Sequence, residues 1–358
     1  MKILHNPLRG KGLEPSVLTT MAQGDVSQNS AAALALFAAC PVANTTPLRD
    51  MPTLAKTWGV SQLQAKLEAN RMGLGSFKAL GATYAIAKMA AARVSMGDHE
   101  AMKTALSDMT FICCSAGNHG LSMAAGAALF GAKAVVVLAE TVPESFAKRL
   151  RAKGTRVVRY GADYEEGMDH SRHLATQNGW FLLSDGSWQG YADPPRDVME
   201  GYLIMGHEAG EQWQGEPPTH VMLQAGVGGL AAGCAVMARK IWGDAVTLVV
   251  VEPEAAPALM ESVRAGQVVD TTGPVSTMGR LDCKTPSHLA LKYLAQEADY
   301  FITLTDQQVA ETVAILEDSD VRTTPSGAAG TAAVHHGGSA IGLNEASRVL
   351  VYISEGVE

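Results

Sequence analysis

The stretch Ser76-Phe77-Lys78-Ala79-Leu80-Gly81 places one lysine between a glycine turn, Gly73-Leu74-Gly75, and an apolar run. Ser76 is a residue type that caps helices, so the pattern predicts a helix over residues 77–94 with Lys78 in its first turn. The helix dipole disfavours positive charge there, so we expect a lowered pKa for Lys78 and an amine that bonds covalently to aldehydes. The simpler interpretation of Lys78 is an ordinary surface lysine. The loops further along the chain distinguish this interpretation from that of a reactive amine.

Short apolar runs alternate with helical segments from about residue 109 onward. The predicted strands, after one at 64–68, are 110–114, 134–138, 156–160, 180–184, 220–224, 247–252, 300–304 and 348–353. Such alternation is typical of right-handed βαβ units and parallel sheets. We therefore predict an α/β fold of two doubly wound domains, in which residues 109–195 form a small domain inserted into a large one. The large domain comprises residues 1–108 and 196–358.

Composition excludes several classes of function. The chain has 358 residues, a length that suggests two domains or one large α/β unit, and its 47% hydrophobic and 18% charged residues are expected of a globular protein. A net charge of -8 and the lack of basic clusters with interleaved aromatics argue against nucleic-acid binding. Apolar runs fall short of the roughly 20 residues that a membrane helix needs. The N-terminus lacks a signal-peptide core, and the five cysteines show neither a disulfide framework nor zinc-ligand spacing. We expect a cytoplasmic protein without a metal site.

Three loops carry the candidate chemistry, and each follows a strand or opens a helix. They contain Lys78, the segment 115–120 and the glycines of 226–229. Ligands of open α/β sheets bind at the carboxyl ends of the strands, so the three loops are predicted to meet in one cleft. The glycine loop precedes a predicted helix over residues 230–241, an arrangement that favours phosphate binding through backbone N–H groups and the helix dipole.

The glycine loop permits two interpretations. Gly226-x-Gly228-x-x-Ala231, followed by Glu252 at a strand end, fits a dinucleotide fingerprint and would suit an NAD-dependent oxidoreductase. That interpretation leaves Lys78 and Asn118 without a role. Pyridoxal 5'-phosphate (PLP) is an aldehyde with a phosphate group, and it would use all three loops.

Four ordered motifs give the chain a resemblance to fold-type II PLP enzymes, which include threonine and serine dehydratases and the tryptophan synthase β chain. These motifs are Ser76-Phe77-Lys78, Ser115-x-Gly117-Asn118-His119, Gly226-Val227-Gly228-Gly229 and Ser354 after the last strand. More narrowly, the chain resembles diaminopropionate ammonia-lyases from about residue 40 onward. The stretches that carry this likeness are 71–81, 185–191, 199–202 and 223–228.

The resemblance implies how PLP is held, in a cleft between the two domains. Lys78 would bond to the aldehyde and take the Cα proton of the substrate, Asn118 would hydrogen-bond the ring hydroxyl oxygen, and Ser354 would face the ring nitrogen. The backbone around the glycine loop would hold the phosphate. The implied cofactor-binding residues are Phe77, Lys78, Asn118, Ala225, Gly226, Val227, Gly228, Gly229, Leu230 and Ser354. Family likeness also suggests a homodimer.

The resemblance further implies where the substrate binds. Ser115, at the N-terminus of a helix, would hold the substrate carboxylate with nearby N–H groups. Asp185 matches an acid of the lyase family that would pass a proton to the departing amine, although Asp-Gly is also a common turn pair. Lys78 and Asp185 are thus the implied catalytic residues. The implied substrate-binding residues are Ser115, Ala116, Gly117, His119, Asp185 and Tyr191.

The expected reaction is α,β-elimination on a small amino acid, with 2,3-diaminopropionate as the favoured substrate and pyruvate and ammonia as products. A serine, threonine or hydroxyaspartate dehydratase is one alternative, and a binding protein without turnover is another. Ala116 stands where the lyase family often has an aspartate linked to the D-isomer, so we expect a preference for L-substrates. Thr324 stands where dehydratases commonly have an acid, so we do not expect a cation site built on such an acid.

Overall fold

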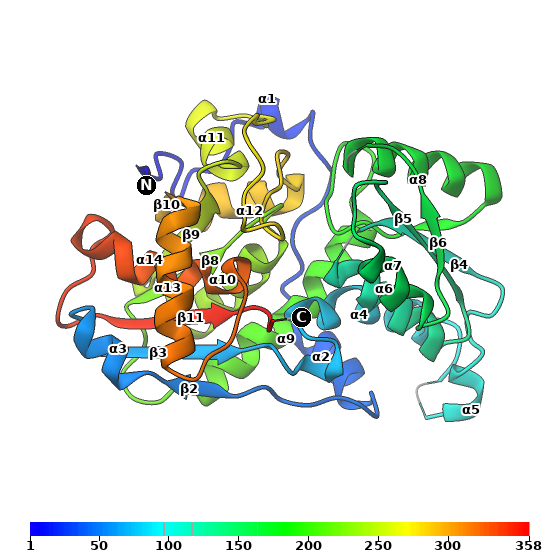
Figure 1. Cartoon of the computed structure of the whole chain (residues 1–358), viewed down its shortest axis with the longest axis horizontal. Helices are drawn as coiled ribbons and strands as arrows, with labels where there is room; N and C mark the ends of the chain where they lie inside the picture. The colour runs from blue at the N-terminus through cyan, green and yellow to red at the C-terminus, as the bar shows by residue number, and fades with distance from the viewer. Residues whose placement is uncertain (96, 116, 163, 358) are drawn as a thin grey trace.

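The computed structural model describes residues 1–95, 97–115, 117–162 and 164–357. Figure 1 shows two sheets in separate lobes, the larger on the left and the smaller on the right. The larger sheet has the order β1-β10-β9-β8-β11-β3-β2, and the smaller has the order β6-β5-β4-β7. The strands of the larger sheet are β1 (Ile3–His5), β2 (Leu48–Asp50), β3 (Gln62–Leu67), β8 (His220–Gln224), β9 (Thr247–Pro253), β10 (Tyr300–Leu304) and β11 (Arg348–Ile353). Those of the smaller are β4 (Thr110–Cys114), β5 (Lys133–Leu138), β6 (Arg156–Arg159) and β7 (Phe181–Leu182).

Parallel pairing dominates both sheets. All the pairs of the smaller sheet are parallel, and in the larger sheet only the edge strands β1 and β2 pair antiparallel. All five residues of β8 are buried, as expected of a central parallel strand covered on both faces. The predicted α/β fold with parallel sheets is therefore confirmed.

Helices cover both faces of each sheet, because successive strand side chains point to opposite faces. In β8, Val221 and Leu223 pack in the core that includes α10, whereas Met222 packs in the core that includes α14. The helices of the larger lobe are α1 (Pro15–Leu18), α2 (Ser30–Ala38), α3 (Pro52–Thr57), α9 (Asp193–Gln212), α10 (Gly229–Trp242), α11 (Ala258–Ala265), α12 (His288–Glu297), α13 (Asp306–Asp318) and α14 (Pro325–Gly337). Those of the smaller lobe are α4 (Gly81–Ala91), α5 (His99–Met102), α6 (Asn118–Leu129), α7 (Glu144–Arg151) and α8 (Tyr164–Asn178). Within the described residues, no helix has both the length and the apolar character needed to cross a membrane.

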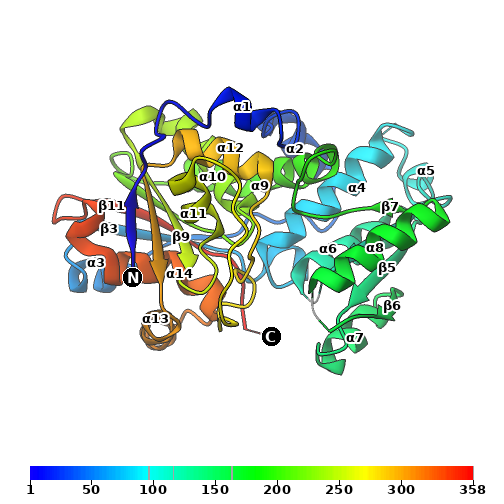
Figure 2. The ribbon, with the colours of Figure 1, turned by 90° about the horizontal axis from the view of Figure 1, so that it is seen from above.

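The two sheets divide the chain much as the predicted domains do. Strands β4 to β7 fall within residues 109–195, and all other strands fall outside that range. Helices α4 and α5 are exceptions, since both precede residue 109 but lie with the smaller lobe, and α4 packs on α6 as well as on α9 (Figure 2). The contact with α6 is close, because a Cβ added at Gly126 would lie 3.0 Å from Thr83 Cα. The domain boundaries therefore stay a proposal.

The segment 324–327 is not the isolated turn that its Pro and Gly residues predict. Thr324 is the N-cap of α14, its hydroxyl oxygen accepts from the Gly327 N–H at 3.1 Å, and Pro325 occupies the first helical position. Helix α14 is rich in alanine and glycine and buried on nearly every side, so it lacks the amphipathic pattern that marks a surface helix.

A buried cluster of charges fastens the segment that leads to Lys78. Arg71 is fully buried in the 3₁₀ turn η1 (Arg71–Gly73), and its guanidinium donates to Glu68 at 2.8 Å and to Glu208 of α9 at 2.6 Å. Lys66 of β3 lies 2.7 Å from the same Glu208 carboxylate. Two positive and two negative side chains thus neutralise each other in a place without water, which holds the chain after β3 against α9.

Replacing Arg71 by methionine is expected to destabilise the protein by about 3–5 kcal/mol, because it leaves two buried carboxylates without their main partner. Urea unfolding followed by tryptophan fluorescence and circular dichroism measures the change. Arg322→Met is the matched control, since the side chain of Arg322 is 73% exposed and lies 3.7 Å from Glu317. The control should stay within about 0.5 kcal/mol of wild type, and an equal loss in both variants would contradict the prediction.

Candidate active site

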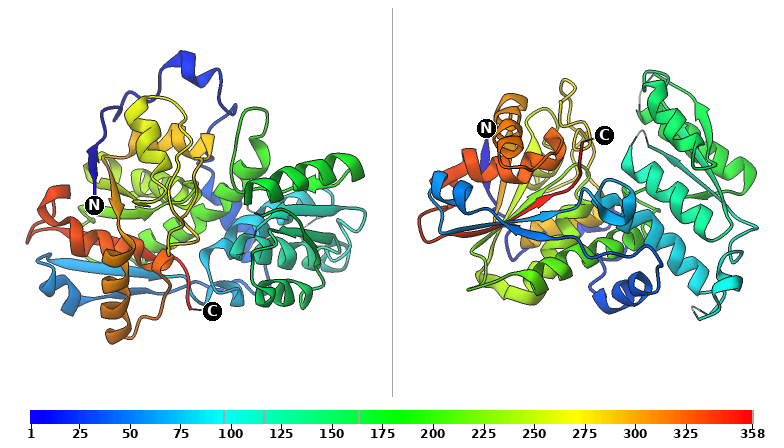
Figure 3. Two further views of the ribbon diagram at one scale, coloured as in Figure 1. Left: turned by 45° about the horizontal axis from the view of Figure 1, so that its top comes forward. Right: turned by 60° about the horizontal axis from the view of Figure 1, so that its bottom comes forward.

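Five loops that follow parallel strands meet where the two lobes join. Strands β3, β11 and β8 are neighbours in the larger sheet, and after them come the lysine segment, Ser354 and the glycine loop. Strands β4 and β7 of the smaller sheet are followed by Ser115 and Asp185. Figure 3 shows the C-terminal end of β11 reaching this junction. Carboxyl ends of parallel strands are where ligands of open α/β sheets bind.

Lys78 contacts Asp185 across this junction. The Lys78 ammonium donates to the Asp185 carboxylate, and each side chain is 19% exposed. The rings of Phe77 and Tyr202 flank the amine, with centroids 5.3 Å and 5.8 Å from Nζ. Lys78 is therefore held inside the protein beside an acid, which excludes the interpretation as an ordinary surface lysine.

The local backbone at Lys78 differs from the prediction. Ser76 is extended, with φ of -163°, and its side chain makes no capping hydrogen bond. Residues Phe77–Leu80 form a 3₁₀ turn, η2, and α4 begins only at Gly81. Gly81 is needed because a Cβ there would lie 2.6 Å from the Tyr202 hydroxyl oxygen. Lys78 thus precedes the α-helix, and the predicted α-helical first turn and Ser76 cap are wrong.

The predicted lowering of the Lys78 pKa is also wrong. Burial alone lowers the pKa of Lys78, but the adjacent Asp185 carboxylate outweighs it and raises the pKa above its usual value. For Asp185 the signs are reversed: burial raises its pKa, whereas the charge of Lys78 brings the net pKa below the usual range. When nothing is bonded to the amine, the pair is an ammonium and a carboxylate.

The glycine loop has the shape of an anion cradle. Gly228 has φ of 101°, a left-handed conformation that favours glycine, and it is the N-cap of α10. A Cβ at Gly226 would lie 2.9 Å from the sulfur of Cys283 and 3.1 Å from the Cα of Leu281, so a larger residue does not fit there. Gly229 faces Tyr202, the ring that also flanks Lys78, with 3.4 Å between its virtual Cβ and the ring. An amine and a phosphate cradle therefore share one site, as PLP requires.

The residues beside the glycine loop are packed into the larger lobe, and their contact with the cofactor stays a prediction. Ala225 is buried and its N–H donates to Val251 at 2.8 Å, and Leu230 of α10 is buried as well. The Val227 side chain faces the turn after Asp185, since a Cβ at Gly186 would lie 4.0 Å from Val227 Cγ1. The glycine loop is thus adjacent to the lysine–aspartate pair.

The asparagine loop presents the N-terminus of α6 to the site. The Ser115 hydroxyl oxygen accepts from the N–H groups of Gly117 and Gly120, at 3.3 Å and 3.1 Å. Asn118 begins α6, and its amide nitrogen donates to Glu355 at 2.6 Å. Ala116 lies outside the described residues. The N-terminus of α6, with the positive end of its dipole, therefore lies at this loop, and binding of a substrate carboxylate there stays a prediction.

His119 is buried beneath the asparagine loop, and one ring nitrogen, Nε2, lies 2.8 Å from the Leu183 carbonyl oxygen. Because a carbonyl only accepts, Nε2 carries the proton. Burial lowers the pKa of His119 below its usual value, so the ring is neutral at pH 7. A neutral His119 ties the first turn of α6 to the segment that precedes Asp185.

Ser354 lies beside Lys78, whereas the Tyr191 hydroxyl contacts the backbone that precedes Asp185. Ser354 is 3% exposed, and its carbonyl accepts from the Phe77 N–H at 3.0 Å, which holds it beside Lys78. The Tyr191 hydroxyl donates to Leu182 at 2.8 Å and accepts from the Ser184 N–H at 3.0 Å. Its ring hydroxyl therefore holds the backbone before Asp185, and a direct contact of Tyr191 with substrate stays a prediction.

Tyr202 and Glu355 are site residues that the sequence analysis missed. Tyr202 lies on α9 and is 1% exposed, and burial raises its pKa to about 12. Tyr202 belongs to the stretch 199–202 that carries the family resemblance, but its position in the middle of a long helix does not mark it as a site residue. Glu355 could have been found, because it directly follows Ser354 at the end of β11, where the carboxyl ends of the parallel strands meet.

Glu252 is unavailable to a nucleotide ribose. Its side chain is fully buried, and its two carboxylate oxygens accept from the N–H groups of Leu259 and Met260, at 2.7 Å and 2.8 Å. Glu252 therefore caps α11 from inside the protein, and the NAD interpretation of the glycine loop loses its second element.

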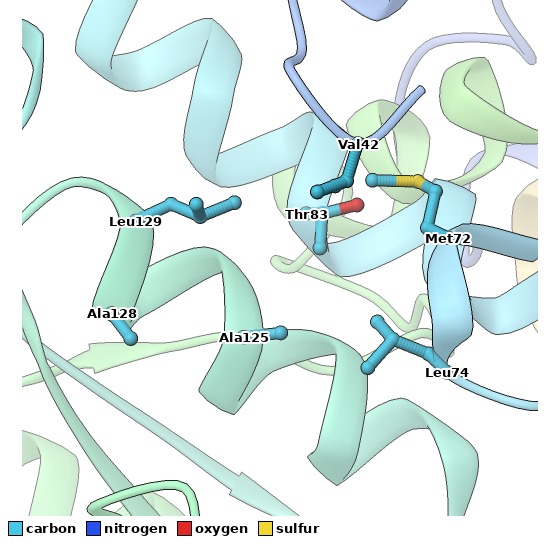
Figure 4. Close-up of a pocket in the computed structure, with 7 residues that line it drawn as sticks. All are labelled: Val42, Met72, Leu74, Thr83, Ala125, Ala128 and Leu129. Carbon is cyan, nitrogen blue, oxygen red and sulfur yellow. The ribbon is translucent and has the colours of Figure 1, made fainter. Parts of the chain in front are cut away.

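Apart from this site, an apolar cavity of about 270 Å³ lies beside α6. Figure 4 shows the side chains that line it pointing toward a common space, namely Val42, Met72, Leu74, Thr83, Ala125, Ala128 and Leu129. Its lining contains no ionisable side chain, so it offers neither an acid nor a base for chemistry.

Comparisons with known proteins agree with this geometry. Residues 40–355 match the family described as pyridoxal-phosphate dependent enzyme. Diaminopropionate ammonia-lyase from Escherichia coli (strain K12) is 31% identical over 334 residues, which are 87% of this chain and 84% of that protein. Human L-serine dehydratase/L-threonine deaminase is 28% identical over 302 residues, which are 82% and 83% of the two chains. The crystal structure of the E. coli lyase in complex with D-serine aligns with a TM-score of 0.88 at 27% identity, covering 99% of this chain and 93% of that one.

These matches confirm the predicted fold-type II architecture and exclude the NAD alternative, since a solved relative carries an aminoacrylate-PLP azomethine reaction intermediate. The chain therefore belongs to the pyridoxal-phosphate dependent enzyme family, with pyridoxal 5'-phosphate as its cofactor.

Proposed function

We propose that this chain is an ammonia-lyase that carries out α,β-elimination on a small amino acid and thereby degrades it. The favoured substrate is 2,3-diaminopropionate, and the products are pyruvate and ammonia. The observation that carries the proposal is the direct contact between Lys78 and Asp185, which places a base and an acid side by side in one buried site. The similarity to the E. coli lyase over most of both chains supports it.

PLP, when bound, withdraws electrons from the α-carbon of the substrate. The residues of the chain then have separate tasks. The N–H groups of 226–229 hold the phosphate, and the N-terminus of α6 with Ser115 holds the carboxylate. The Lys78 amine would take the Cα proton, and the rings of Phe77 and Tyr202 beside it limit the access of water.

Asp185 is suited to deliver a proton to the departing amine. Burial raises its pKa and the charge of Lys78 lowers it, so the two effects oppose each other. Whenever the Lys78 nitrogen is uncharged, the effect of burial dominates and Asp185 becomes able to hold a proton. A substrate with a second amino group would pair its ammonium form with the Asp185 carboxylate and leave as ammonia with its proton kept, which favours diaminopropionate over serine.

A dehydratase acting on serine or threonine is the second candidate, supported by the similarity to the human enzyme. Initial rates of 2-oxo acid release from diaminopropionate, serine and threonine by the purified holoenzyme separate the two. We expect kcat/KM for diaminopropionate to be larger by about 10²-fold or more, since a buried carboxylate discriminates strongly between an ammonium and a hydroxyl group. A higher value for serine or threonine would favour the dehydratase, and the lack of any ammonia release would favour a binding protein.

We further propose a preference for the L-isomer. The D-isomer presents its Cα proton on the face opposite to the lysine, and Ala116 offers no acid or base to remove it. We expect L-2,3-diaminopropionate to react about 10²-fold faster than the D-isomer, the lower range for a missing general base. The measurement is pyruvate release from each pure enantiomer, and comparable rates would contradict the prediction.

Assembly, location and domain division complete the proposal. We expect a homodimer in the cytoplasm, with twice the chain mass of 37.6 kDa in light scattering after size-exclusion chromatography. The proposed domains are residues 109–195 and the remainder. Residues 81–91 lie at the boundary between the proposed domains, because α4 packs on α6 of one and on α9 of the other.

A further inference from the structure

Glu355 is a buried carboxylate that the proposed mechanism does not use. Its side chain is 4% exposed, although it directly follows the residue expected to face the cofactor ring. Its backbone is fixed independently of the side chain: Glu355 pairs with Ser76 in an isolated β-bridge, and its carbonyl accepts from the Thr323 hydroxyl at 2.5 Å. The carboxylate is therefore held at a defined place beside the lysine segment.

Three side chains from separate parts of the chain converge on this carboxylate. Asn118 of α6 donates its amide N–H to one oxygen at 2.6 Å, and the Thr324 hydroxyl donates to the other oxygen. Arg280 lies 3.8 Å from Glu355, and its guanidinium packs on Gly117 and over the ring of Phe146. Both oxygens of this buried carboxylate thus have a donor, and a positive charge lies nearby.

The contact with Glu355 decides which way the Asn118 amide faces. The oxygen and nitrogen of an asparagine amide are nearly equal in shape, so the hydrogen-bond partners determine the orientation. The atom of the Asn118 amide that lies 2.6 Å from the Glu355 carboxylate is the nitrogen. That nitrogen has a second N–H group, which remains for an acceptor on the other side.

We propose that Glu355 is the positioning residue of Asn118. Its carboxylate fixes the amide so that the second N–H group faces the ring hydroxyl oxygen of PLP. This inference rests on the proposed function and on the contact with the ring hydroxyl oxygen of PLP that the family resemblance implies for Asn118. Glu355 itself does not touch the reacting atoms, and it acts through the orientation of Asn118.

A double-mutant comparison of holoenzymes tests the proposal. The variants are Glu355→Gln, which keeps shape but allows either amide orientation, Asn118→Ala, and the two combined. The readouts are the visible absorption band of the bound cofactor and the rate of PLP release into an excess of a trapping protein. We expect each single variant to release PLP about tenfold faster and to shift the band alike. The double variant should have the same PLP release rate and absorption band as Asn118→Ala alone, because it has no Asn118 amide for residue 355 to orient.

Two further variants make the result decisive. Glu317→Gln is the control, since its side chain is 63% exposed, and it should behave as wild type. Glu355→Asp keeps the charge but withdraws the oxygens from Asn118, so it should match Glu355→Gln and stands in for it if that variant does not fold.

The proposal would be overturned if both Glu355 variants released PLP at the wild-type rate. It would also be overturned if the double variant released PLP faster than Asn118→Ala, by the product of the two single effects. An unchanged cofactor band in Asn118→Ala would also overturn it. None of these readouts needs turnover, so a holoenzyme that releases no ammonia contradicts the proposed function and leaves this test intact.

Discussion

Replacing Lys78 by alanine is expected to lower kcat for ammonia release by at least about 10⁴-fold, the upper range for loss of a general base. The variant loses both the amine that bonds to the cofactor and the base beside the Cα proton. It also leaves Asp185 buried without its partner, and loss of the Lys78 charge removes a major cause that lowers the pKa of Asp185. A coupled assay of pyruvate measures the rate.

Lys103→Ala is the control for Lys78→Ala, because the side chain of Lys103 is 64% exposed and pairs only with its helical neighbour Glu100 in the salt bridges of the described structure. Its rate should equal that of wild type. Borohydride reduction followed by peptide mass spectrometry should place the cofactor on Lys78 in wild type and remove that label in Lys78→Ala. Activity of Lys78→Ala near that of the control, or a label on another lysine, would refute the assignment.

Replacing Asp185 by asparagine is expected to lower kcat by about 10²–10⁴-fold, since a general acid is lost while the shape of the side chain is kept. The same substitution is expected to favour another step, the bonding of Lys78 to the cofactor. The Asp185 carboxylate raises the pKa of Lys78, so its removal leaves burial to lower that pKa. A larger fraction of the Lys78 amine is then neutral at pH 7, and the variant stripped of cofactor should bond to PLP faster than wild type does.

The pH dependence of cofactor capture checks this second effect. In wild type the rate of capture should rise steeply with pH above neutrality, and in Asp185→Asn the rise should begin at lower pH. Asp169→Asn is a suitable control, because its side chain is 78% exposed. If wild type and Asp185→Asn capture PLP with the same pH dependence, Asp185 does not govern the charge of Lys78. If kcat of Asp185→Asn equals that of wild type, Asp185 is not the general acid.

The sequence predicted the parallel sheets and the loops of the site because both depend on local signals. Apolar runs such as 110–114 and 220–224 mark buried strands, and glycine-rich turns mark the points where backbone approaches a ligand. Since parallel strands align their carboxyl ends, the loops at Lys78, Asn118 and Gly228 were expected to meet. The structure brings all three to one junction.

The features that were predicted wrongly depend on contacts between distant residues. The cap at Ser76 failed because that residue pairs with Glu355, which is 279 positions away in the chain (355 - 76). The pKa of Lys78 rises instead of falling because Asp185, from the other lobe, lies against the amine. Helix α14 was missed because a helix buried on all sides shows no polar face. Local patterns contain no information about such partners.

The order of strands in the larger sheet has a consequence for biosynthesis. Strand β11 comes last in the chain, yet it lies between β8 and β3, near the middle of the sheet. Until it is made, the nascent polypeptide holds two half-sheets with open edges, and such edges recruit other chains. The cofactor pocket is likewise incomplete, because Ser354 and Glu355 follow that strand. Chaperones that shield unpaired edges should therefore raise the yield of this enzyme more than an added supply of PLP during synthesis.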